Sequence, residues 1–167
     1  MLTQSVRLLS LVFSALILGG AFCHVLEMPV KLTLPGAEYT VVQQVYGAFG
    51  PVGAVLEPAA ILSAATLAFL VRRRRSFVPA LVGAVTLVTA LLVWAAVVNP
   101  VNPHWAAAAP GTVPPDFVAL RARWEWGHAA HAALLFLAFV ALVVSVLVEI
   151  PRRPAAAAAR RRDRRAA

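Results

Sequence analysis

The chain has 167 residues, of which 61% are apolar and only 13% are charged, and its formal net charge is +8. An ordinary soluble domain is about half apolar and about a quarter charged, so this composition excludes a water-soluble globule. The same numbers exclude a disordered chain, which would be poor in apolar residues. The excess positive charge indicates a partner only once the basic residues are placed relative to the apolar segments.

Four apolar segments are long enough to be membrane-spanning helices. A spanning α-helix needs about 20 predominantly apolar residues, and such runs occur at residues 8–26, 47–71, 77–98 and 127–150. We therefore expect an all-α fold, an integral membrane four-helix bundle that occupies residues 1–150. Within it, residues 99–126 are predicted to form an outer interfacial segment. Residues 151–167 are predicted to be a disordered tail rich in arginine and alanine.

The basic residues predict the orientation of these helices. Of the 15 basic residues, 12 lie in the N-terminus, the turn after the second span and the tail, namely Arg7, Arg72 to Arg75, Arg152, Arg153, Arg160 to Arg162, Arg164 and Arg165. Only Lys31, Arg121 and Arg123 lie in the segments that would face the other side. Because cytoplasmic loops are enriched in basic residues, both termini are predicted to be cytoplasmic, in a multi-pass plasma-membrane protein. The tail would then contact anionic lipid rather than nucleic acid.

Polar residues within the spans gather at one depth. At about 1.5 Å of rise per residue, His24, Glu57 and His131 lie at similar heights above the cytoplasmic ends of their helices. Trp94 reaches a similar height on the third helix. Ionisable groups inside a membrane are costly and mark functional sites by default. We therefore expect a pocket in the outer half of the bilayer to which every helix contributes.

Two further groups of residues flank this layer. One stripe of the fourth helix, with spacings of three, four and three residues, contains Arg121, Trp124, His128 and His131. Asn99 and Asn102 follow the third span, each before a proline that favours extended or turn backbone. Their amides would either orient a substrate oxygen or cap the helix and the turn.

Three chemistries and one structural role fit these side chains. Imidazoles and carboxylates on facing helices are typical ligands of a transition metal such as Cu, Fe or Zn, and the candidate ligands are His24, Glu57, His128 and His131. Alternatively, His128 or His24 acts as a general base that a nearby carboxylate tunes. Haem ligation is the least favoured, because the histidines do not form two pairs at two depths. The structural alternative is a non-catalytic membrane subunit in which a buried Glu–His pair fixes helix register.

Three short motifs lie at the ends of the predicted spans: His24-x-x-Glu27-x-Pro29-x-Lys31, Asn99-Pro100-x-Asn102 and Arg121-x-x-Trp124-x-x-x-His128. In these motifs and in its architecture, nearly the whole chain resembles the anthrone oxygenase-like family of small four-helix membrane proteins. That family includes enzymes that oxidise anthrones to anthraquinones with dioxygen, and many members have no assigned activity. The resemblance implies that the pocket residues are Asn99, Asn102, Arg121, Trp124 and His128.

The sequence therefore predicts a membrane-embedded oxidoreductase or oxygenase that acts on an apolar aromatic or phenolic small molecule with dioxygen. The predicted catalytic residues are His128, His24 and Glu57. The predicted substrate-binding residues are Asn99, Asn102 and Arg121, which would hold a developing oxyanion, and Trp94 and Trp124, which would stack on the ring. Its cofactor is either none or a transition metal ion. The alternatives are a metal-binding membrane protein and a structural subunit, and the sequence leaves open whether a homo-oligomer forms.

Overall fold

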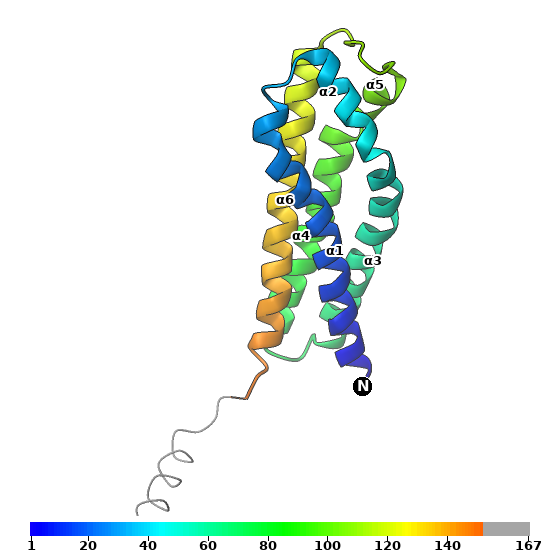
Figure 1. Cartoon of the computed structure of the whole chain (residues 1–167). Coiled ribbons are helices and arrows are strands. Elements are labelled where there is room, and N and C mark those ends of the chain that lie inside the picture. Colours follow the sequence, from blue (N-terminus) through cyan, green and yellow to red (C-terminus); the bar gives the residue numbers. More distant parts are fainter. Residues whose placement is uncertain (152–167) are drawn as a thin grey trace, which may run out of the picture.

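The computed structural model describes residues 1–151, which form helices joined by short turns (Figure 1). The elements in chain order are α1 (Leu2–Lys31), α2 (Gly36–Gln43), the 3-10 helix η1 (Gln44–Ala48), α3 (Phe49–Leu70), α4 (Phe77–Val93), the π-helical turn η2 (Trp94–Val98), α5 (Asn102–Ala107) and α6 (Phe117–Leu147). These residues contain no strand. The predicted tail, apart from Pro151, lies outside the described residues.

Four helical stretches are long and apolar enough to cross a membrane. They are Leu2–Lys31, Gly36–Leu70, Phe77–Val98 and Phe117–Leu147. About a third or less of each most apolar window is buried inside the bundle, so most of the apolar side chains point outward. Such a surface would be unfavourable in water but is suited to a lipid environment. The predictions of an all-α chain and of four helices of membrane-spanning length are therefore confirmed.

Two helices extend further than the apolar runs predict. α1 ends at Lys31 rather than at residue 26, and it continues through Pro29, whose missing N–H removes only one intrahelical bond. α6 begins at Phe117, so residues 117–126 of the predicted interfacial segment belong to the same helix as the predicted fourth span. Both extensions carry ionisable residues into the bundle.

The four long helices pack as a closed ring. α1 contacts α3 and α6, and α4 contacts the same two helices from the other side. Small residues let the backbones approach closely, as membrane helices require in the absence of a hydrophobic driving force between them. A Cβ atom on Gly83 of α4, for example, would lie 2.8 Å from Leu142 Cγ of α6. The core of the ring includes Ala60, Ala64, Leu67, Leu87, Leu135 and Leu142.

An ion-pair cluster joins three segments at the end of the bundle that carries the N-terminus (Figure 1). Arg7 Nη2 of α1 lies 2.5 Å from Glu149 Oε2 after α6, and Ser76 Oγ before α4 donates a hydrogen bond to Glu149. Burial alone would raise the pKa of Glu149, but the Ser76 hydrogen bond and the charges of Arg7 and Arg74 outweigh it and lower the pKa below its ordinary value. The cluster therefore fixes the ends of α1, α4 and α6 relative to one another.

The opposite end of the bundle is covered by α2 and α5 (Figure 1). Beneath them lies a second, aromatic core that includes Tyr39 of α2, Trp105 of α5 and Trp124 of α6. The Tyr39 ring centroid lies 5.4 Å from that of Trp105 and 5.5 Å from that of Phe117. This aromatic layer closes the bundle above the polar residues of the long helices.

Candidate functional site

A cavity of about 720 Å³ lies inside the half of the bundle that α2 and α5 cover. α1, η1, α3, η2, α5 and α6 and the last turn of α4 all contribute to its lining. Most of this lining is apolar and includes Ile17, Phe49, Leu56 and Leu91. Its volume falls within the range of about 300 to 1,000 Å³ that is usual for small-molecule sites.

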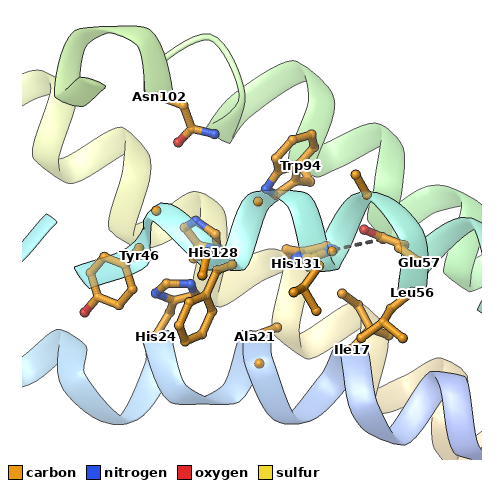
Figure 2. A pocket seen from close by; sticks show the side chains of 18 of the residues that line it. Ile17, Ala21, His24, Tyr46, Leu56, Glu57, Trp94, Asn102, His128 and His131 are labelled. Carbon is orange, nitrogen blue, oxygen red and sulfur yellow. Dashed lines mark hydrogen bonds and ion pairs between the residues drawn. The ribbon is translucent and has the colours of Figure 1, made fainter. Parts of the chain in front are cut away.

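A row of three histidines and one glutamate runs along this cavity (Figure 2). The ring centroids of His24 on α1 and His128 on α6 are 4.1 Å apart. One turn further along α6, the His131 ring lies 6.5 Å from that of His128. His131 Nε2 is 3.0 Å from Glu57 Oε1 of α3, and the pair is buried. The structure therefore brings together His24, His128, His131 and Glu57, as the sequence predicts.

The ring nitrogens of the histidines differ in their surroundings. Nδ1 of His24, His128 and His131 is enclosed by protein and has no hydrogen-bond partner. Nε2 of His131 is occupied by Glu57. Nε2 of His24 and Nε2 of His128 are not among these enclosed nitrogens. In a neutral imidazole such a nitrogen either accepts or donates one hydrogen bond.

Aromatic rings hold His24 and His128 in place. The Trp124 ring centroid lies 4.2 Å from His128 and 5.0 Å from His24. The ring centroids of Tyr46 and Phe49 lie 4.7 Å and 5.4 Å from that of His24. Tyr46 of η1 and Phe49 of α3 were not predicted as site residues, because the sequence pattern does not show that their rings line the cavity.

Asn102 is oriented by the same tryptophan. Trp124 Nε1 donates a hydrogen bond to Asn102 Oδ1 at 2.9 Å, so the Nδ2 amide group of Asn102 is the end left for a ligand. Asn102 and Trp94 both line the cavity, and Figure 2 shows them on the same side of the histidine row. This side therefore offers hydrogen-bond donors opposite the imidazoles.

The position of Trp94 depends on the π-helical turn η2. The turn frees backbone carbonyls, and Arg123 of α6 binds two of them, with Nε donating to Val97 O at 2.9 Å and Nη2 to Ala96 O at 2.8 Å. Gly127 of α6 lets η2 approach closely, since a Cβ there would lie 2.7 Å from Val98 Cγ2. Nothing in the local sequence predicts a π-turn, which the packing against α6 sets.

A buried ion pair lies behind Trp124. Lys31 Nζ is 2.8 Å from Glu125 Oε1 and 4.3 Å from the Trp124 ring centroid. Tyr39 donates a hydrogen bond from its hydroxyl to the same Glu125 oxygen at 2.8 Å. Both charged side chains are at most 3% exposed. The sequence places Lys31 among the outer basic residues, and only the full length of α1 brings it inside.

Two predicted substrate-binding residues do not line the cavity. Asn99 follows η2 with an exposed side chain. Its backbone N–H donates to Trp94 O at 2.9 Å, and its backbone carbonyl accepts from Asn102 N at 3.2 Å. Arg121 donates from Nη1 to Leu34 O at 3.2 Å, and its guanidinium lies 4.9 Å from the Phe117 ring centroid. The turn after α1 therefore covers the part of α6 that carries Arg121. An oxyanion in the cavity would therefore meet Asn102 rather than Asn99 or Arg121.

The four predicted metal ligands form two pairs rather than one ligand set. His24 stacks against His128, while His131 is hydrogen-bonded to Glu57. Within residues 1–151, no group of three or more His, Cys, Asp or Glu side chains is arranged to hold a metal ion. The donor set therefore does not fit a resident metal, whereas two neighbouring pairs of titratable groups fit acid–base chemistry.

Comparison with protein-family models, curated proteins and solved structures found no match. Within residues 1–151, the structure defines an all-helical fold in which four helices of membrane-spanning length surround a histidine-lined cavity. The resemblance to the anthrone oxygenase-like family rests on the sequence motifs and stays a prediction.

Proposed function

We propose that this protein is a membrane-embedded oxygenase that oxidises an apolar aromatic or phenolic small molecule with dioxygen. The observation that carries the proposal is the contact of His24 with His128 at the wall of an apolar cavity that both side chains line. A base in an apolar pocket suits removal of a proton from a weakly acidic carbon.

The proposal includes a location and an orientation. The protein would span the plasma membrane four times with both termini in the cytoplasm, because 12 of its 15 basic residues then lie on that side. The cavity would lie in the outer half of the bilayer, where an apolar substrate arrives from the lipid. The arginine-rich tail would contact anionic lipid on the opposite face.

The chemistry begins at a carbon whose C–H bond is acidified by neighbouring rings and a carbonyl group. Nε2 of His128 or His24 takes a proton from this carbon, and the electron pair spreads over the rings and the carbonyl oxygen. Dioxygen then oxidises the carbanion. For a CH₂ group the balanced reaction is R₂CH₂ + O₂ → R₂C=O + H₂O, which needs no further oxidant or reductant.

Side chains around the histidines supply orientation. The Nδ2 amide of Asn102 and the indole N–H of Trp94 would donate to the substrate oxygen that gains negative charge. Trp124 would stack against the ring system, since it already packs on both histidines. Exclusion of water strengthens these interactions relative to their strength in solution.

The structural alternative accounts for less of the site. A pair that only fixes helix register needs one Glu–His contact, which Glu57 and His131 supply. It does not require that His24 and His128 also contact each other at a cavity of about 720 Å³. The proposed function uses both this histidine contact and the cavity.

The test uses the full chain purified in detergent, with anthrone as the probe. Anthraquinone formation and oxygen consumption are measured for wild type, His24→Ala, His128→Ala and the matched control His104→Ala, whose side chain is exposed on α5. Loss of a general base costs about 10²- to 10⁴-fold in rate, so we expect at least one of the two cavity variants to lose about 100-fold and the control to keep its activity. A folded wild type without turnover, or cavity variants that match the control, would contradict the proposal.

A further inference from the structure

The cavity contains a second acid–base unit that proton removal by His24 or His128 does not use. His131 Nε2 and Glu57 Oε1 are 3.0 Å apart, and their side chains are 5% and 6% exposed. The His131 ring lies 6.5 Å from the His128 ring, too far for a direct hydrogen bond between them. Two separate pairs therefore line one cavity, and we will call them the outer pair (His24 and His128) and the inner pair (His131 and Glu57).

The balanced oxidation requires two kinds of proton transfer. Each turnover removes two protons from one carbon and delivers two protons to oxygen, because one atom of dioxygen leaves as water. A group that has just taken a proton from carbon lies beside that carbon, whereas the proton is needed on the distal oxygen. Two acid–base units at different positions along the cavity separate these tasks.

Resting on the function proposed above, we infer that the inner pair is the proton donor to the oxygen atoms. At the 3.0 Å distance between Nε2 and Oε1, a proton on either group would be shared between imidazole and carboxylate, so the pair can give one proton at a time. Ile17 and Leu56 line the cavity beside this pair, as Figure 2 shows. Dioxygen is an apolar gas and is favoured at this apolar end, so it is reduced next to the donor.

The proposed steps conserve atoms and electrons. The carbanion left by the outer pair forms a C–O bond with dioxygen, which gains the electron pair and becomes a peroxide anion on the substrate. The inner pair gives its proton to the distal oxygen, producing a hydroperoxide. The outer pair then takes the second proton from the same carbon, the C–H electrons form the C=O bond, and the O–O bond breaks to release hydroxide. Before this second removal, the first proton passes from the outer pair to the inner pair, which gives it to the hydroxide to form water. The second proton then passes from the outer pair to the inner pair and restores the starting state.

Two measurements separate the tasks of the pairs. In D₂O without oxygen, exchange of the acidic C–H protons of anthrone, followed by mass spectrometry against a protein-free blank, reports proton removal alone. In air, anthraquinone formation reports the complete reaction. Both are measured for wild type, Glu57→Gln, His131→Gln, His128→Ala and the exposed control Glu38→Gln.

We expect Glu57→Gln and His131→Gln to keep exchange within about twofold of wild type, while anthraquinone formation falls by about 100-fold or more, the usual size of a general-acid contribution. The peroxide anion on the substrate should accumulate in these variants and be detected as the hydroperoxide after acid quenching. His128→Ala should lose both exchange and oxidation, and Glu38→Gln should lose neither. Exchange at the wild-type rate also shows that the variants are folded around an intact outer pair.

Three outcomes would overturn the inference. If both inner-pair variants lose exchange and oxidation together, the inner pair serves proton removal or assembly. If neither measurement changes, the pair has no part in the reaction. If oxidation falls without any peroxide, the protonation step is wrong. A wild type that neither exchanges nor oxidises anthrone would instead refute the proposed function, which is a separate result.

Discussion

Lys31 Nζ and Glu125 Oε1 lie 2.8 Å apart in the interior of the bundle, and each side chain is almost completely shielded from solvent. α1 supplies the cation and α6 the anion, so the pair joins two helices that also carry His24 and His128. The ammonium group lies over the Trp124 ring, at 4.3 Å from its centroid. The ion pair therefore supports the aromatic wall of the cavity from behind.

Breaking this pair should destabilise the protein strongly. In Lys31→Met the Glu125 carboxylate remains buried without its cation, which in comparable cases costs about 3 to 5 kcal/mol. We expect a large fall in the Tm measured in detergent. Removal of both charges in Lys31→Met/Glu125→Leu should recover much of the loss, because no uncompensated charge remains. A single variant with wild-type Tm would show that the pair contributes little.

The close packing of η2 on α6 predicts opposite effects for two glycine substitutions. In Gly127→Ala the new Cβ would lie 2.7 Å from Val98 Cγ2 and 3.0 Å from Val97 Cγ1, and overpacking of this kind costs about 1 to 3 kcal/mol. The shift of η2 would also move Trp94, so affinity for anthrone should fall. The control Gly19→Ala has nothing within 4 Å of its Cβ and should be neutral or stabilising, since alanine favours a helix interior. Equal Tm values for the two variants would contradict this assignment.

The sequence predicts the four long helices well because length and hydropathy suffice for a membrane-spanning helix. It also predicts that His24, Glu57 and His131 lie at a similar depth, because rise per residue fixes their depth once the helices are antiparallel. Depth alone does not fix rotation. Whether His131 binds Glu57 or His128 depends on the rotation of each helix about its own axis. The observed rotations divide the predicted ligand set into two pairs.

Asn99 and Arg121 lie outside the cavity lining for a different reason. Asn99 and Arg121 were placed at the pocket from motifs next to the spans, where local features of the backbone decide direction. The π-turn η2 ends at Val98 and leaves the Asn99 side chain outside, and the turn after α1 provides a carbonyl at Leu34 for Arg121. Lys31 was named in the motif that begins at His24 but was not predicted as a buried residue, because the apolar run ends before Glu27, although the helix does not.

Asn102 should set the preference for an oxygen-bearing ligand. Its Oδ1 is occupied by Trp124 Nε1, which leaves the Nδ2 group to donate to a substrate carbonyl. Asn102→Leu should weaken binding of anthrone by up to about tenfold, corresponding to about 1.4 kcal/mol for one hydrogen bond. Binding of 9,10-dihydroanthracene, which has no oxygen, should change less. The matched control Asn99→Leu changes an exposed amide and should bind both compounds as wild type does. If Asn102→Leu loses the same affinity for both compounds, the hydrogen bond to the substrate oxygen is contradicted.

The stability of the bundle should decrease in acid through Glu149. Because Arg7, Ser76 and Arg74 lower its pKa in the folded state, the unfolded chain takes up the proton at a higher pH than the folded chain does. The stabilisation is therefore complete above the pKa of an unfolded glutamate, about 4.3, and it is lost as the pH falls through the lower folded-state pKa. We expect the Tm of wild type to be nearly constant from about pH 7 to pH 5.5 and to fall below that range.

Glu149→Gln should have a lower Tm at pH 7 and a shallower fall, because the neutral amide cannot form the ion pair with Arg7 and does not titrate. The exposed control Glu38→Gln should keep the wild-type dependence of Tm on pH. If the Tm of Glu149→Gln falls with pH in parallel with that of wild type, other carboxylates cause the acid sensitivity.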